Sequence, residues 1–296
     1  MALLGILSII QAWFIPGFLF ILLFKKVKIL DNLVLSVPLS LVLNYILVYF
    51  LVCFKIYNQQ IFLFIIFFQI IFILLILIKR YELKILINKI DIFFSLDKSK
   101  NLLNINISIL NFIILFFFII YFFYAIKNLG QPISLGDPIV MWNEWAISWS
   151  KNIIPIDVEY PQAVPILNSI SYVLLNSYEI EYFSRATCLI YPIWIFIIFF
   201  RLIYIFPEEK LLIKLTLIIT VVFVLSVLRN YSLYIGYSDP FLILVSLSSG
   251  FIFIYNYIEN KNTNKIKTIE LKNIILISLI ASAPAITKQM GLLISF

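Results

Sequence analysis

The chain has 296 residues, of which 63% are hydrophobic and only 12% are charged. A soluble domain carries about 25% charged residues, so this composition indicates an integral membrane protein. The net charge of +7 does not indicate nucleic-acid binding, because the basic residues sit in short patches between apolar runs. Histidine is absent, which excludes Ser/His and Cys/His catalysis. Both cysteines lie inside apolar runs, which excludes a disulfide frame and a cysteine metal site.

Several apolar runs are long enough to form membrane spans. A helix needs about 20 mainly apolar residues to cross a hydrocarbon core of about 30 Å. The runs lie at about 2–24, 33–54, 61–78, 107–126, 183–206, 211–228, 240–258 and 273–296. The first is too long, and too poor in N-terminal positive charge, for a typical signal peptide, so we expect a retained helix. We therefore predict an all-α fold, a polytopic transmembrane helix bundle of about 8–9 spans.

One further apolar stretch, at about 163–178, is short and rich in polar residues. At 1.5 Å per residue it reaches only about 24 Å. It contains Asn168, Ser169, Ser171, Asn176 and Ser177. If it crossed the membrane, every later loop would change sides and the charge bias described next would reverse. We expect a partial, re-entrant or steeply tilted helix.

Lysine and arginine predict the orientation of the bundle. Sixteen of them fall in alternate loops, including the segment 79–106, and only five fall in the other loops. The richer loops are expected to be cytoplasmic, which places the segment 127–162 and the loop 229–239 outside. The 79–106 connection is amphipathic and is expected to lie on the cytoplasmic membrane surface. We divide the chain into an N-terminal helical module, 1–106, and a core, 107–296.

The outer segment 136–149 holds the densest group of unusual residues. Asp137 followed by Pro138 predicts a helix start, with Asp as N-cap and Pro at the first helical position. Trp142, Trp145 and Trp149 fall on one face of this helix, and Glu144, Ser148 and Lys151 fall on another. This pattern predicts a helix in the membrane interface, with its tryptophans at the lipid headgroups. The alternative to a functional role is that Asp137 only caps the helix and the tryptophans only anchor it.

Two further acids are expected near the outer surface. Asp239 precedes Pro240 at the start of the 240–258 span, and Glu159 lies in the segment Val-Glu-Tyr-Pro-Gln. Together with Asp137 they form a candidate cluster that could deprotonate a hydroxyl or hold a divalent cation through oxygen ligands. Capping again remains open as the simpler role of Asp239.

Two basic residues stand where a membrane protein disfavours them. Arg185 opens the 183–206 span from the outside, against the positive-inside bias. Lys288 lies inside the last apolar run, and an ionisable residue within a span is a functional hypothesis by default. Lys288 also lies about 22 Å along that helix, so the alternative is that its side chain extends to the outer interface.

The order of these motifs resembles the GT-C glycosyltransferases, in particular the aminoarabinose transferases of lipid A and the protein O-mannosyltransferase-like group. The resemblance covers roughly residues 107–296. The matching motifs are Asp137 with the helix 139–150, Glu159-Tyr160-Pro161, Arg185 in Phe-Ser-Arg-Ala, Tyr234 to Pro240, and Thr287-Lys288-Gln-Met-Gly291. The resemblance implies a sugar donor linked to a polyprenyl phosphate, used on the outer face of a prokaryotic cell membrane.

The resemblance also implies roles for individual residues. Asp137, Asp239 and Glu159 are the expected catalytic residues, with Asp137 as the base that activates the acceptor hydroxyl. Expected substrate contacts come from Arg185, Lys288, Tyr160, Gln162, Trp142 and Asn143. The acceptor is a glycan, a lipid or a protein. A cofactor is not implied with certainty, although the acids could hold a divalent cation.

Two other expectations accompany this interpretation. A transporter or lipid flippase would use the same intramembrane charges for passage of its substrate. Against it, the sequence shows neither matched half-repeats nor spans interrupted by Gly and Pro. We also expect the chain to be the front part of a longer protein, because 273–296 remains apolar to its end without an interfacial belt.

Overall fold

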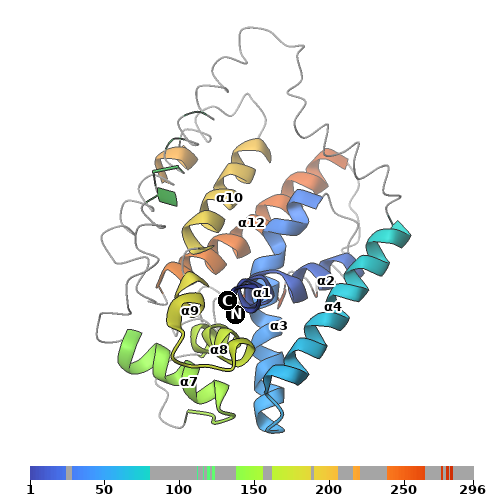
Figure 1. Ribbon diagram of the computed structural model, residues 1–296. Helices are drawn as coiled ribbons and strands as arrows, with labels where there is room; N and C mark the ends of the chain where they lie inside the picture. Colours follow the sequence, from blue (N-terminus) through green and yellow to red (C-terminus); the bar gives the residue numbers. More distant parts are fainter. Residues whose placement is uncertain are drawn as a thin grey trace.

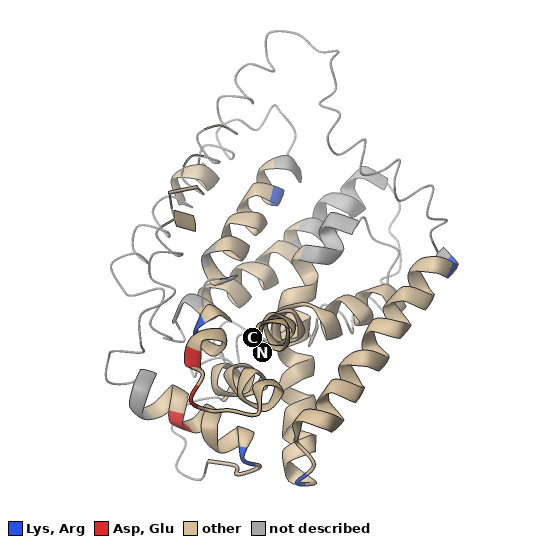
Figure 2. Ribbon diagram, in the orientation of Figure 1, with Lys and Arg blue, Asp and Glu red and all other residues tan. Residues whose placement is uncertain are grey.

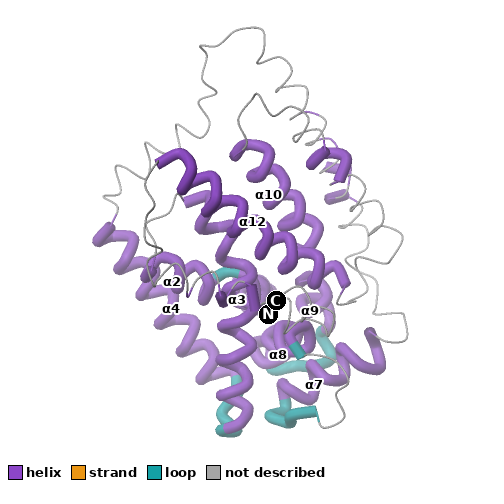
Figure 3. The backbone as a smooth tube through the Cα atoms, turned by 180° about the vertical axis from the view of Figure 1, so that it is seen from behind, coloured by secondary structure: helices purple, strands orange, loops and turns teal. Residues whose placement is uncertain are grey.

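A computed structural model describes residues 1–24, 29–80, 112, 116, 119, 120, 122, 123, 138–155, 162–187, 190–205, 216–220, 239–263, 275, 278, 279, 281 and 282. Most of these residues are helical and no strand occurs among them, as Figure 3 shows from behind. The all-α prediction is therefore confirmed for the described part of the chain. Its elements are α1 (Ala2–Trp13), α2 (Ile15–Phe24), α3 (Ile29–Cys53), α4 (Gln59–Arg80), the π-helix η1 (Pro138–Asn143), α7 (Glu144–Ser150), α8 (Ala163–Leu175), α9 (Glu181–Ala186), α10 (Ile190–Ile205) and α12 (Asp239–Thr263).

The long apolar helices support a membrane protein. Two helical segments are long and apolar enough to cross a membrane, Val34–Cys53 in α3 and Gln59–Lys79 in α4, and the pair α1 and α2 adds a third if it is one span. Within the described residues α8 and the apolar parts of α10 and α12 are shorter. The spans predicted at 107–126, 211–228 and 273–296 and the amphipathic connection 79–106 lie largely outside the described residues.

The first predicted span is broken rather than continuous. Helices α1 and α2 meet at Phe14 with a bend of 45°. The physical cause is Pro16, which has no N–H to donate to the carbonyl of Ala12 four residues earlier. Asn44 of α3 supplies hydrogen bonds at the break instead. Its Nδ2 donates to the carbonyls of Gln11 and Ala12 at 3.0 Å each. The expectation of a single retained helix over 2–24 was therefore wrong in its continuity.

Helix α2 packs closely against α3 just after this break. The backbone N–H of Gly17 donates to the hydroxyl of Ser40 at 2.9 Å. A Cβ added to Gly17 would overlap the carbonyl oxygen of Ser36 and lie 2.6 Å from the backbone nitrogen of Ser40. Small residues allow this close approach of two backbones, which is how helices associate within membranes.

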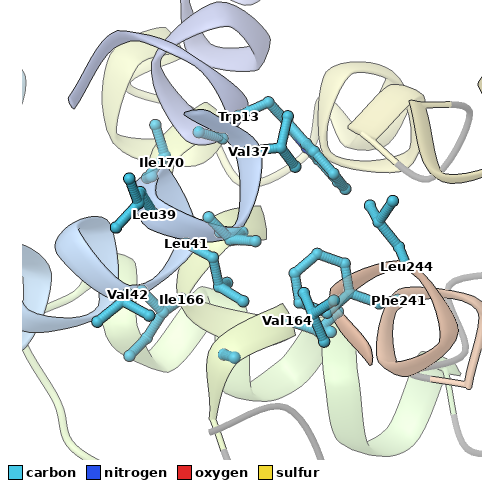
Figure 4. Close-up of a cluster of buried hydrophobic side chains, with 14 of the residues drawn as sticks. Trp13, Val37, Leu39, Leu41, Val42, Val164, Ile166, Ile170, Phe241 and Leu244 are labelled. Atoms are coloured by element: carbon cyan, nitrogen blue, oxygen red, sulfur yellow. The ribbon is translucent and has the colours of Figure 1, made fainter. Parts of the chain in front are cut away.

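One hydrophobic core connects the N-terminal module with the later helices. Figure 4 shows side chains of α1, α3, α8 and α12 converging. The members labelled there are Trp13, Val37, Leu39, Leu41, Val42, Val164, Ile166, Ile170, Phe241 and Leu244. Within this core the ring of Trp13 lies 4.9 Å from that of Tyr191 and 5.4 Å from that of Phe241. The residues before and after position 106 therefore share one core.

Helix α4 lies at the edge of the bundle and leaves most of its apolar side chains uncovered. Figure 1 shows α4 beside α2 and α3, with one side open. Phe64, Phe67, Phe72, Leu75 and Ile78 are all exposed. A continuous apolar surface of this kind fits lipid acyl chains better than water.

Figure 2 shows charged residues at the end of α4, on α10, on α9 and α7, and at the turn between α3 and α4. The basic end of α4, with Lys79 and Arg80, lies far from α7 in Figure 1. The turn between α3 and α4 lies at the opposite end, beside the end of α7. There the N–H of Tyr57 donates to Asn152 Oδ1, and Asn152 Nδ2 donates back to the carbonyl of Tyr57, both at 3.0 Å. This contact agrees with the prediction that the turn between α3 and α4 and the segment 127–162 lie on the same side of the membrane.

Candidate functional site

The helix predicted at 139–150 is present as η1 followed directly by α7. It begins at Pro138, the residue expected at the first helical position. Asp137, its expected N-cap, lies outside the described residues. The polar face is as predicted, since Glu144 and Lys151 are exposed, and the ammonium of Lys151 lies 4.5 Å from the centre of the Tyr178 ring. A π-helical turn is a rare local geometry that occurs often at functional sites.

The tryptophan face of this helix points into the protein, so the prediction of headgroup anchors was wrong. Trp142 and Trp149 are only 5% and 2% exposed, and Trp145 is partly buried against the same core. Trp149 Nε1 donates to Oε1 of the buried Gln162 at 3.1 Å. Helix α7 packs on α8. Buried between the helices, the indole rings make more apolar contacts than they would among lipid headgroups.

Helix α8 lies at the centre of the site, and every one of its residues is buried. Its 13 residues reach about 20 Å, too short to cross the hydrocarbon core, which fits the partial helix predicted at 163–178. The helix ends at Asn176, which adopts a left-handed conformation with φ of 51°. The N–H of Ser177 then donates to the carbonyl of Tyr172 at 3.1 Å, the pattern of a Schellman cap.

The buried polar side chains of α8 are satisfied from the elements around it. The hydroxyl of Tyr57, in the turn after α3, lies 3.2 Å from that of Ser169. Burial raises the pKa of Tyr57, so this hydroxyl stays protonated at ordinary pH. On another side the hydroxyl of Thr187 donates to Asn168 Oδ1 at 3.1 Å. Polar groups held in this way in an apolar interior fix the position of the helix, because leaving one unpaired costs free energy.

A chain of three polar side chains joins α8, η1 and α9. The hydroxyl of Tyr172 donates to Asn143 Oδ1, and Asn143 Nδ2 donates to Glu181 Oε1 at 3.1 Å. Tyr172 is 2% exposed and Asn143 is 7% exposed. The hydrogen bond from Tyr172 is buried and the one to Glu181 is partly buried, so Asn143 is itself fixed and orients the carboxylate of Glu181.

Arg185 lies in the last turn of α9 and is 7% exposed. The predicted span 183–206 is described as two helices, α9 and α10, with Arg185 in the first. Helix α9 is held against α1, where the ring of Phe183 occupies the space that a side chain at Gly5 would need. The guanidinium carries five N–H donors in a planar fork, which suits it to bind a phosphate or carboxylate.

The structure brings four of the predicted site residues onto neighbouring elements and leaves the others untested. Trp142, Asn143, Gln162 and Arg185 lie on η1, at the start of α8 and on α9. Asp137, Glu159, Tyr160 and Lys288 lie outside the described residues. Asp239 is the first residue of α12, as the Asp-Pro pair predicted, and its side chain is not described.

The sequence did not point to Glu181, Tyr172, Asn168 or Thr187. These residues are common types without a motif, and only their contacts give them a place in the site. One available signal was the spacing of Glu181 and Arg185, which puts an acidic and a basic residue one helical turn apart.

Among the described residues no group of three Cys, Asp or Glu side chains is placed to hold a metal ion. What the described site offers is hydrogen-bond donors and acceptors, one buried cation and one oriented carboxylate. No protein-family model, curated protein or solved structure matches the chain.

Proposed function

We propose that this chain is a polytopic membrane glycosyltransferase of the GT-C type, with about 8–9 spans and a site on the outer face of a prokaryotic cell membrane. The order of motifs from Asp137 to Lys288 supports this proposal. The packing of η1, α7, α8 and α9 around a buried polar centre is the structural observation consistent with it.

The observation that carries the proposal is the burial of Arg185. A cation in an apolar bundle is costly, and such residues are generally retained for a functional partner. A phosphate group linked to a membrane lipid fits this position, because it is an anion that arrives from within the bilayer. Nucleotide sugars are not normally supplied outside the cytoplasm, so a polyprenyl-phosphate-linked sugar is the donor that an outward site would use.

The reaction follows from the proposed roles. The oxygen of the acceptor hydroxyl attacks the anomeric carbon, the bond from that carbon to the phosphate oxygen breaks, and Asp137 takes the hydroxyl proton. Arg185 and Lys288 stabilise the polyprenyl phosphate that leaves. Asp239 and Glu159 position the acceptor or a divalent cation. A single displacement inverts the anomeric centre.

One observation favours the second candidate, a transporter or flippase. Discontinuous helices often form substrate sites in transporters, and α1 and α2 are such a pair. The expectation that no span is interrupted by Gly and Pro was therefore wrong for the first span, which breaks next to Pro16 and Gly17. At this break, however, Asn44 Nδ2 already donates hydrogen bonds to the carbonyls of Gln11 and Ala12. Those carbonyls are therefore occupied within the protein, which leaves the transferase as the better supported function.

The test is binding of undecaprenyl phosphate to the protein in lipid nanodiscs. Arg185→Gln is expected to weaken binding by about 10- to 100-fold, because hydrogen bonds between charged groups contribute about 1.5–3 kcal/mol. Arg185→Lys keeps the charge and should lose less. The matched control is Arg201→Gln, which removes the same charge from α10. Equal affinity of wild type, Arg185→Gln and Arg201→Gln would contradict the assigned phosphate site.

A further inference from the structure

One carboxylate oxygen of Glu181 is hydrogen-bonded within the protein, and the other can accept a hydrogen bond. Its Oε1 accepts the hydrogen bond from Asn143 Nδ2 at 3.1 Å. Among the described residues no further hydrogen-bond or ion-pair partner of Glu181 occurs, and its side chain is half-buried. The second oxygen is therefore able to accept a hydrogen bond from a ligand.

The support behind this carboxylate is rigid. Asn143 is fixed in turn by the hydroxyl of Tyr172, which belongs to the fully buried helix α8. Asn143 is also the residue where the π-helix η1 passes into α7. An acceptor that is oriented in advance loses little conformational entropy when a ligand binds, which favours a binding role over an accidental surface position.

Glu181 and Arg185 stand one turn apart on α9. Residues four positions apart lie on the same helical face, about one pitch of 5.4 Å from each other. In a glycosyl phosphate the charged phosphate and the hydroxyl groups of the sugar are separated by a comparable distance. A cation and a carboxylate at this spacing therefore match the two chemically different halves of such a ligand.

On this basis, and resting on the proposed function, we propose that Glu181 binds hydroxyl groups of the donor sugar while Arg185 binds the adjoining phosphate. An ionised carboxylate is purely an acceptor, and its hydrogen bonds with hydroxyl groups are strengthened by its charge. Glu181 then distinguishes a sugar-bearing lipid from the bare lipid phosphate. Asn143 and Tyr172 act as positioning residues for Glu181.

The experiment compares undecaprenyl phosphate with a panel of its mannose, glucose and aminoarabinose derivatives, each titrated against protein in nanodiscs. Wild type is expected to bind at least one sugar-bearing lipid more tightly than the bare phosphate. Glu181→Gln should abolish that preference, a loss of about 10-fold or more in the affinity for the sugar-bearing lipid relative to the bare phosphate. It should not weaken binding of the bare phosphate, because it removes a negative charge close to Arg185. Glutamine can still accept the hydrogen bond from Asn143, so the local structure is retained.

Two controls make the result specific. Glu144→Gln removes one charge from the exposed face of the same end of the molecule and should keep the preference. Glu181→Asp keeps the carboxylate on a shorter side chain and should restore part of it. A preference that survives in Glu181→Gln, or a wild type without any preference, overturns the role of Glu181. Failure of wild type to bind undecaprenyl phosphate itself would instead overturn the proposed function.

Discussion

Replacing Asp137 by Asn is expected to lower the rate of sugar transfer by about 10²- to 10⁴-fold, the usual contribution of a general base. Asparagine has nearly the same shape but does not take up the proton of the attacking hydroxyl. It remains a good N-cap, so the helix that begins at Pro138 should be retained. The measurement is transfer of labelled sugar from a polyprenyl-phosphate donor, normalised to the amount of folded protein in the membrane.

The control is Asp157→Asn, which removes another acid from the same outer segment. We expect this variant to keep nearly full activity. Thermal unfolding of both variants should stay close to that of wild type, because asparagine caps a helix about as well as aspartate does. If Asp137→Asn keeps full activity per folded molecule, Asp137 only caps the helix and another residue is the base.

Replacing Gly17 by Ala is expected to destabilise the bundle by about 1–3 kcal/mol or more. The added methyl group would overlap the carbonyl oxygen of Ser36, which is backbone and cannot turn away. To relieve the overlap α2 must move from α3 and weaken the hydrogen bond from Gly17 to Ser40. The measurement is thermal unfolding in detergent, followed by tryptophan fluorescence, with a fall of several degrees in the apparent Tm.

Gly250→Ala is the matched substitution. A Cβ at Gly250 in α12 would meet no atom of the described neighbouring elements within 4 Å, so no steric cost is expected from them. In a helix interior alanine is favoured over glycine by about 1 kcal/mol, so this variant should be neutral or slightly more stable. Equal loss of stability in both variants would show that the contact between Gly17 of α2 and Ser36 of α3 is not a tight one.

The sequence allowed the helical class and several helix starts to be predicted, for local reasons. Pro138 and the Asp239-Pro240 pair mark the first residues of η1 and α12, because proline lacks the N–H that the first turn leaves unpaired anyway. The brevity of α8 also followed from local composition, since polar residues interrupt its apolar run. In these cases the cause lies within the segment itself.

Other features depended on contacts between distant segments. The spacing of Trp142, Trp145 and Trp149 defined a face, but only the packing of α8 decides that this face points inward. Pro16 was a visible signal for the bend after α1, although the bend is stable only because Asn44 supplies the missing donors. Similarly, Glu181 became a candidate only through its bond with Asn143.

The central claim is that the end of the bundle carrying α7, α9 and the turn after α3 faces the outside, where only a lipid-linked donor is supplied. Labelling of single cysteines by a membrane-impermeant maleimide tests it most directly, after Cys53 and Cys188 are replaced by Ser. Three exposed positions suffice, Lys55 and Lys151 at this end and Lys79 at the other. Lys55→Cys and Lys151→Cys should react in intact cells, and Lys79→Cys only after permeabilisation. Reaction of Lys79→Cys in intact cells, with the other two protected, would place the site inside and contradict the account.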